Sequence, residues 1–150
     1  MTTNGREETR SDSNMGQEIP ASLINRTNAP VLAHLRDLSA HSDIAEVLIT
    51  AVNGLGDVQI FCPDSAAYRY VVVSTQGIVF GFCVGMSTIA FRLDERMKQR
   101  ALVTGAMPYP DCGHDWVCVT PHGGDDWPKV DVPFWALKAY VHARETRPKA

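Results

Sequence analysis

The stretch from Gly77 to Glu145 constrains the fold most, because each of its segments has the pattern of a defined structural element. Aromatic and β-branched residues dominate 78–84 and 87–93, which favours two strands joined by a turn at Gly85. A helix, a further strand and a closing helix are expected to follow them. A pair of strands succeeded by helix, strand and helix predicts an α+β fold.

The helix after these two strands has clear end signals. Asp94 is suited to cap its N-terminus, and Gly105 supplies a C-terminal stop. Residues 107–114 are bounded by prolines and are predicted to form a loop, whereas 115–120 has the pattern of a short strand. In the last helix, apolar side chains recur on one side, which predicts that this helix closes the core: Phe134, Leu137 and Val141.

The remaining strands precede this stretch. Segments 58–62 and 68–75 are rich in aromatic and β-branched residues and are predicted to form a meander with 78–84. Residues 1–18 are polar and lack periodicity, so we expect a disordered tail there. The prediction is therefore a single α+β domain over 19–150, with a mostly antiparallel sheet of four to five strands and helices packed on one face.

Two helices are expected before the first strand. Asn28 followed by Pro30 marks a helix start, because a short polar side chain can cap orphan N–H groups and proline is tolerated in the first turn. This helix is expected to end near His41. Residues 43–53 fit a second helix, which we favour, although their β-branched content is also compatible with a strand.

The strand over 78–84 is predicted to have two unlike faces, since successive side chains of a strand point to opposite sides. Large apolar residues would share one face: Ile78, Phe80, Phe82 and Val84. Smaller residues would share the other: Val79, Gly81, Cys83 and Gly85. A flat face of this kind indicates close packing of a helix, or the floor of a groove.

Composition excludes some classes of function. The chain has 150 residues and a formal net charge of -3, which disfavours affinity based on general phosphate neutralisation and hence nucleic acid as a partner. No segment has the apolar length of a secretion signal or a membrane span, so we expect a cytoplasmic protein that does not bind membranes. In a reducing compartment its cysteines are expected to be free and mostly buried: Cys62, Cys83, Cys112 and Cys118.

One cluster of residues has the chemistry of a metal site. Cys112, His114, Cys118 and His122 carry the thiolate and imidazole ligands that zinc prefers, on two loops that flank a short strand. Their spacing is not that of a standard zinc knuckle, and free cysteine is among the most buried residue types. We therefore expect no cofactor, with zinc as the alternative. Cys112 and His114 could also be a nucleophile and its base, but the sequence identifies no third group that would orient the histidine.

A second group of residues suggests recognition of a ligand or partner: Arg92, Trp116, Trp127 and Trp135. Tryptophan combines a large apolar area with a polar N–H, and arginine can hold a carboxylate or phosphate through two hydrogen bonds. The alternatives are structural. The tryptophans of the loop and last helix would cover the sheet, and Arg92 would pair with a surface acid such as Asp94 or Glu95.

Three segments carry a resemblance to known proteins: GMSTIAFRL, GHDWV and DDWPKVDVPFWALKAYVHARE. They resemble a group of short bacterial proteins with no assigned activity, and the order of elements is similar to that of TfoX N-terminal and YjbR-like domains. The resemblance implies a small α+β fold and a bacterial cytosolic setting.

We predict on this basis an accessory protein that acts as a binding or interaction module for a protein or a small ligand. The alternative is a zinc-binding protein or metal-dependent enzyme that uses Cys112, His114, Cys118 and His122. No catalytic residue is identified, and the sequence leans against an enzyme. The edge strand of a small sheet can be buried by a second copy, so the pattern is compatible with a homodimer.

Overall fold

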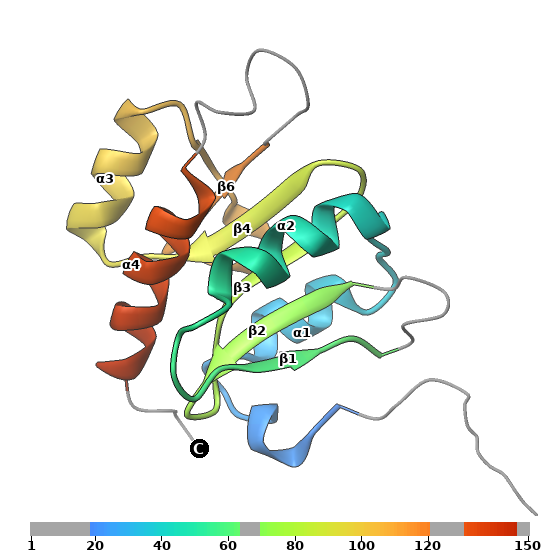
Figure 1. The fold of residues 1–150 in the computed structure, drawn as a ribbon. Helices are drawn as coiled ribbons and strands as arrows, with labels where there is room; N and C mark the ends of the chain where they lie inside the picture. Colours follow the sequence, from blue (N-terminus) through green and yellow to red (C-terminus); the bar gives the residue numbers. More distant parts are fainter. Residues whose placement is uncertain (1–18, 64–69, 121–130, 147–150) are drawn as a thin grey trace, which may run out of the picture.

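The computed structural model describes residues 19–63, 70–120 and 131–146. These residues form one sheet with helices on both of its faces (Figure 1). In this described part of the chain the sheet has six strands, in the order β1-β2-β3-β4-β6-β5, and each neighbouring pair is antiparallel. The strands are β1 (Gln59–Phe61), β2 (Val71–Thr75), β3 (Ile78–Val84), β4 (Thr88–Arg92), β5 (Met107–Pro108) and β6 (Trp116–Val119). The helices are α1 (Ala29–Leu35), α2 (Ser42–Val52), α3 (Glu95–Val103) and α4 (Val132–Arg144), with short 3-10 helices η1 (Ala21–Leu23) and η2 (Pro110–Cys112).

The predicted α+β class with an antiparallel sheet is confirmed. The sheet has more strands than the four to five expected, because Met107 and Pro108 pair with Cys118 and Val117 as β5. This segment was expected to be a loop on account of its prolines. Proline is compatible with a strand at the edge of a sheet, where its missing N–H is not needed for pairing.

Helices cover both faces of the sheet, not one as expected. One face packs against α2, α3 and α4, and we call it the α4 face. The other packs against η1, α1 and η2, and we call it the α1 face; in Figure 1, α1 lies behind the sheet and α2 in front. All residues of β2 and β3 are buried, so these central strands need a cover on each side.

A bulge in β3 overturns the predicted division of its faces. Val73 pairs with Gly81 but Ser74 pairs with Val79, so Phe80 is an extra residue in β3. As a result Phe80 packs on the α4 face and Phe82 on the α1 face. A Cβ at Gly81 would lie 3.1 Å from both Phe91 Cδ1 and Val73 Cγ2, which explains the glycine next to the bulge.

The favoured helix over 43–53 is confirmed as α2. His41 caps it, since Nδ1 accepts a hydrogen bond from Asp43 N at 3.1 Å. The buried residues of α2 recur at helical spacing and pack on the α4 face: Ile44, Ala45, Leu48 and Val52. Apolar periodicity thus decides this element, and the β-branched side chains are accommodated in the helix.

The start of α1 follows the prediction, but the role of Asn28 and the end of the helix do not. The side chain of Asn28 makes no capping bond; instead Oδ1 accepts from Val79 N at 3.0 Å. The helix ends at Leu35 and not near His41. The chain after it turns to pair with the β3–β4 turn, where His41 N donates to Gly85 O at 2.8 Å.

Candidate functional site

Arg92 and Trp116 lie opposite each other on neighbouring strands, β4 and β6. Directly opposed residues of antiparallel strands point to the same face of the sheet. Both line a cavity of about 240 Å³ at this end of the sheet. The other lining residues are Arg26, Thr27, Cys112, Gly113, His114, Asp115 and Thr146.

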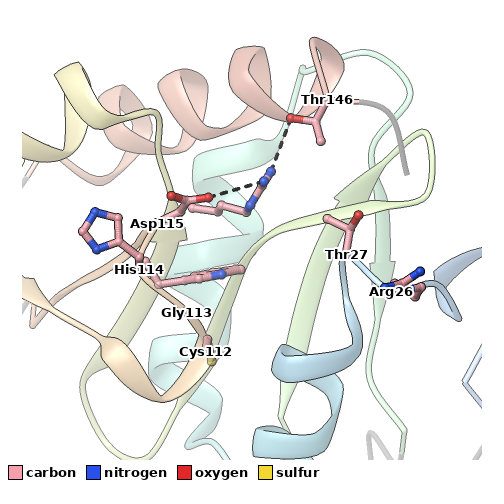
Figure 2. A pocket seen from close by; sticks show the side chains of 9 residues that line it. Arg26, Thr27, Cys112, Gly113, His114, Asp115 and Thr146 are labelled. Atoms are coloured by element: carbon pink, nitrogen blue, oxygen red, sulfur yellow. Dashed lines mark hydrogen bonds and ion pairs between the residues drawn. The ribbon is translucent and has the colours of Figure 1, made fainter. Parts of the chain in front are cut away.

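Three separate segments form the cavity walls (Figure 2). Arg26 and Thr27 come from the turn before α1, the residues from Cys112 to Asp115 come from the connection between η2 and β6, and Thr146 follows α4. In Figure 2, Asp115 lies on one side of the view and Thr27 on the other, and Thr146 lies above both. The site is therefore built where both helical layers meet the end of the sheet.

The guanidinium of Arg92 is held by two polar contacts. Its Nη1 donates to Thr146 Oγ1 at 3.3 Å, and its Nη2 lies 3.5 Å from Asp115 Oδ2. The predicted ion pair with a surface acid therefore exists, but the partner is Asp115 and not Asp94 or Glu95. A guanidinium has five N–H donors, so contacts with the described residues leave donor capacity that a ligand can use.

The indole of Trp116 is nearly enclosed, with 3% of its surface exposed. It packs against Phe82 with ring centroids 5.2 Å apart. Its N–H makes no hydrogen bond to any residue that the structure describes, and a buried donor without a partner is unfavourable. The ring edge that carries this N–H lies beside Gly113, since a Cβ there would be 3.8 Å from Trp116 Cδ1. The donor is therefore on the side of a residue that lines the cavity.

Helix α3 fixes the wall formed by His114. Lys98 is buried, and its Nζ donates to His114 O at 2.6 Å and lies 3.5 Å from His114 Nδ1. Glu95 Oε1 lies 3.1 Å from His114 Nε2. Since a carboxylate only accepts and an ammonium only donates, these contacts assign the hydrogen of the neutral ring to Nε2. Both ring nitrogens are thus engaged from one side of α3.

The carboxylate of Glu95 takes part in this arrangement as an anion. Its pKa is lowered, first by the hydrogen bond from Gln99, whose Nε2 donates to Oε2 at 2.7 Å, and next by the hydrogen bond from His114. Glu95 and Lys98 are three positions apart and therefore share a side of the helix. Together they set the position of the chain that leads into Asp115.

The described members of the predicted metal cluster do not come together. Among the residues that the structure describes, no group of three His, Cys, Asp or Glu side chains is placed to hold a metal ion. Cys112 packs on the α1 face with Cys118 beside that cluster, whereas His114 turns to Glu95 and Lys98. His122 lies outside the described residues.

A nucleophilic role for Cys112 is also disfavoured. Burial, with a smaller contribution from Asp111, raises the pKa of its thiol to about 12. The thiolate is the reactive form of cysteine, so this thiol is inert at neutral pH. The ring nitrogens of His114 contact Lys98 and Glu95 and not the Cys112 thiol. The pKa of Cys118 is likewise raised by burial.

Of the remaining predicted binding residues, Trp135 is not part of this site. Trp135 is 8% exposed and packs edge to face against Phe134, with ring centroids 4.8 Å apart. It lines a second cavity of about 240 Å³ near the start of α4, which Thr104, Val119 and Asp131 also line. Trp127 lies outside the described residues. Sequence reasoning thus identified two residues of the main cavity as binding groups, and the structure separates Trp135 from them.

Several lining or supporting residues carry no signal in the sequence. Thr27 and Thr146 are single polar residues in turns, and Lys98 has the ordinary composition of an exposed helix position. Lys98 and His114 are 16 positions apart, and only the packing of α3 against β6 brings them together. No local pattern could have predicted this contact.

Comparisons of this chain with protein-family models, with curated proteins and with solved structures give no match. Among the described residues there is also no helix with the length and apolarity needed to span a bilayer.

Proposed function

We propose that the protein is a binding module that takes up a small ligand in the cavity at Arg92 and Trp116. One observation carries this proposal: two largely buried side chains on neighbouring strands, each with unused hydrogen-bond donors, line the same cavity. Concave sites with a few convergent polar groups are the usual form of small-molecule sites. The cavity lining includes the exposed residues Arg26 and His114, so a ligand can reach it from solvent.

Binding is favoured over catalysis by the state of the reactive groups near the cavity. The Cys112 thiol is held protonated, with its pKa raised to about 12, and the ring nitrogens of His114 are engaged by Lys98 and Glu95. A nucleophile and a base within hydrogen-bond reach of each other are the minimum for covalent catalysis. The described lining residues support recognition better than bond making.

We further propose that this module is a bacterial cytosolic accessory protein. The support is the resemblance of GMSTIAFRL and DDWPKVDVPFWALKAYVHARE to short bacterial proteins, together with the four cysteines, none of which forms a disulfide, as suits a reducing compartment.

The test is a fragment screen by two-dimensional ¹⁵N NMR on the full chain. The mixture contains small neutral, anionic and cationic aromatic compounds, and the indole N–H signal of Trp116 is assigned by its loss in Trp116→Phe. Binding in the cavity will shift this signal and the backbone signals of Gly113 and Thr146, while the indole signal of Trp135 stays in place. Shifts confined to the second cavity, or no shifts at millimolar fragment concentration, refute the proposal.

A further inference from the structure

On the basis of the ligand-binding function above, we propose that the ligand is a small oxyanion. It carries a carboxylate or a phosphate group that replaces the Asp115 carboxylate on Arg92 and accepts the indole N–H of Trp116. In the ligand-free protein the Asp115 carboxylate contacts Arg92 in place of the ligand, so it competes with the ligand for the guanidinium. Arg92, Trp116 and Asp115 thus have three distinct roles in the site.

The charge of the cavity favours an anion. Two arginines, Arg26 and Arg92, and one aspartate, Asp115, line it, so its fixed charges sum to a positive value. The chain as a whole has a formal net charge of -3, so this positive balance is local to the site and not a general property of the surface. A net positive charge in a low-dielectric cleft concentrates ligands of the opposite sign.

The contact between Arg92 and Asp115 has the geometry of an exchangeable pair. It is a single contact at 3.5 Å, whereas arginine and a carboxylate bind most strongly through two parallel hydrogen bonds of about 2.7–2.9 Å. The Asp115 side chain is 47% exposed and that of Arg92 is 16% exposed. The aspartate can therefore turn into solvent at little cost, while the guanidinium stays inside the site.

The backbone of Asp115 does not need to move for this exchange. Its carbonyl oxygen accepts a hydrogen bond from Leu93 N at 3.0 Å, and Lys98 holds the preceding residue through His114 O. On the other side, Thr146 Oγ1 donates to His142 O at 2.8 Å while it accepts from Arg92. Only the Asp115 side chain needs to leave, and Arg92 keeps Thr146 as a support.

The Trp116 donor gives a second, independent reason for an acceptor ligand. A buried N–H without a partner loses the hydrogen bond that it makes to water in the unfolded chain. An oxyanion in the cavity supplies the missing acceptor at the same time as it binds Arg92. A carboxylate offers two oxygens and a phosphate three, enough for both side chains.

The cavity volume limits the size of the ligand. Sites for drug-sized molecules span about 300–1,000 Å³, and this cavity has about 240 Å³. The ligand is therefore a small acid or a small phosphate ester. The two sources share the same oxyanion chemistry, and direct binding measurements distinguish them.

The experiment is an NMR titration of the full chain with benzoate, phenyl phosphate and inorganic phosphate, with benzamide as the neutral counterpart of benzoate. Benzoate or phenyl phosphate is expected to shift the Trp116 indole signal, and benzamide to bind more weakly. The tighter of the two aromatic anions identifies the source. Shifts with inorganic phosphate alone would assign the site to the free ion.

Two variants test the roles of the charged residues. Asp115→Asn removes the competitor and is expected to tighten anion binding about two- to fivefold, the range set by a partly exposed ion pair. Arg92→Lys keeps the charge but loses the two-point geometry, and is expected to weaken binding about tenfold. Asp111→Asn makes the same charge change at an exposed residue of η2, outside the cavity lining, and is expected to leave affinity unchanged. Thermal unfolding of each variant checks that it is folded.

The outcomes separate this inference from the proposed function. If benzamide binds in the cavity as tightly as benzoate, or Asp115→Asn behaves like Asp111→Asn, the oxyanion inference fails and ligand binding stands. If Asp115→Asn weakens anion binding, Asp115 is a ligand contact and not a competitor, and the inference is again overturned. If no compound of any charge shifts the signals of the lining residues, the proposed function itself fails.

Discussion

Replacing Asn28 with alanine tests the contact that joins the α1 side of the molecule to the sheet. Asn28 is 1% exposed. Its Nδ2 donates to Leu23 O at 2.9 Å and to Gly77 O at 2.8 Å, and its Oδ1 accepts from Val79 N at 3.0 Å. One side chain thus connects η1, the β2–β3 turn and the bulged strand β3.

The magnitude follows from what each partner loses. Val79 lies beyond the last β3–β4 pair, so without Asn28 its buried N–H loses its acceptor, which costs about 1–3 kcal/mol. The Leu23 carbonyl still accepts a hydrogen bond from Asn25 N, and the Gly77 carbonyl still accepts one from Asn25 Nδ2. The loss of each hydrogen bond from Asn28 Nδ2 therefore costs only about 0.5–1.5 kcal/mol. We expect Asn28→Ala to lower the free energy of unfolding by about 3 kcal/mol.

Urea denaturation, followed by far-ultraviolet circular dichroism, measures this change. The matched control is Asn53→Ala, the same side-chain deletion at the exposed residue after α2, where we expect less than about 0.5 kcal/mol. If the two variants are equally stable, the Asn28 network contributes no net stability and the reasoning is wrong. A changed slope with urea would show instead that the variant alters the folded or unfolded ensemble.

Two further predictions concern packing and pH. Gly81→Ala places a Cβ 3.1 Å from Phe91 Cδ1 and is expected to destabilise the fold by about 1–3 kcal/mol. The control is Gly56→Ala, where the atom nearest to the new Cβ is 3.9 Å away and the expected change is within about 0.5 kcal/mol. Equal midpoints of urea denaturation for the two variants would contradict this prediction. Burial, and then the Arg92 guanidinium, lower the pKa of His142 below its ordinary 6.5, so the unfolded chain takes up this proton at a higher pH than the folded chain. The contribution of His142 to the free energy of unfolding is therefore fully present above pH 6.5 and is lost as the pH falls through the lowered pKa. When the pH is lowered from about 7.5 to about 5.5, the His142→Gln variant is expected to lose less stability than the wild type. The same pH dependence in both proteins would rule out His142 as its source.

The elements that local patterns define were predictable from the sequence. Asp94 caps α3 as expected, since its Oδ1 accepts from Met97 N at 2.8 Å. The apolar spacing of 43–53 identified α2, and the pattern of 115–120 identified the strand β6. In each case the signal is carried by residues within one or two turns of each other, where helix and strand periodicity are informative.

Features that depend on distant contacts were not predictable. The bulge at Phe80 is set by the pairing of β2 with β3, and it reverses the face of every later residue of the strand. The position of α1 depends on the Asn28 side chain, which looked like a helix cap. The contact between Lys98 and His114 likewise appears only when α3 packs beside β6. The resemblance to TfoX N-terminal and YjbR-like domains stays a prediction.

The candidate site was partly predictable for the same reason. Arg92 and Trp116 were identified as binding residues from their chemistry alone, because an indole joins a large apolar area to a polar N–H and a guanidinium can hold an oxyanion through two hydrogen bonds. That they are cross-strand neighbours is a matter of register between β4 and β6. Asp115, which was not identified as the partner of Arg92, follows from the same register, since it directly precedes Trp116.

The distribution of strong and weak contacts explains how one site can be rigid and still exchange its ligand. Each wall is tied down by a buried or short polar contact: Asn28 on the α1 side, Lys98 beneath the His114 turn and the Thr146 hydroxyl at the end of α4. The contacts of the guanidinium itself are long, at 3.3 and 3.5 Å. Because the walls are held independently of Arg92, replacement of the Asp115 carboxylate by a ligand changes side-chain partners without moving the backbone. A preorganised site of this kind avoids most of the ordering cost of binding, so a small ligand with few contacts can still bind measurably.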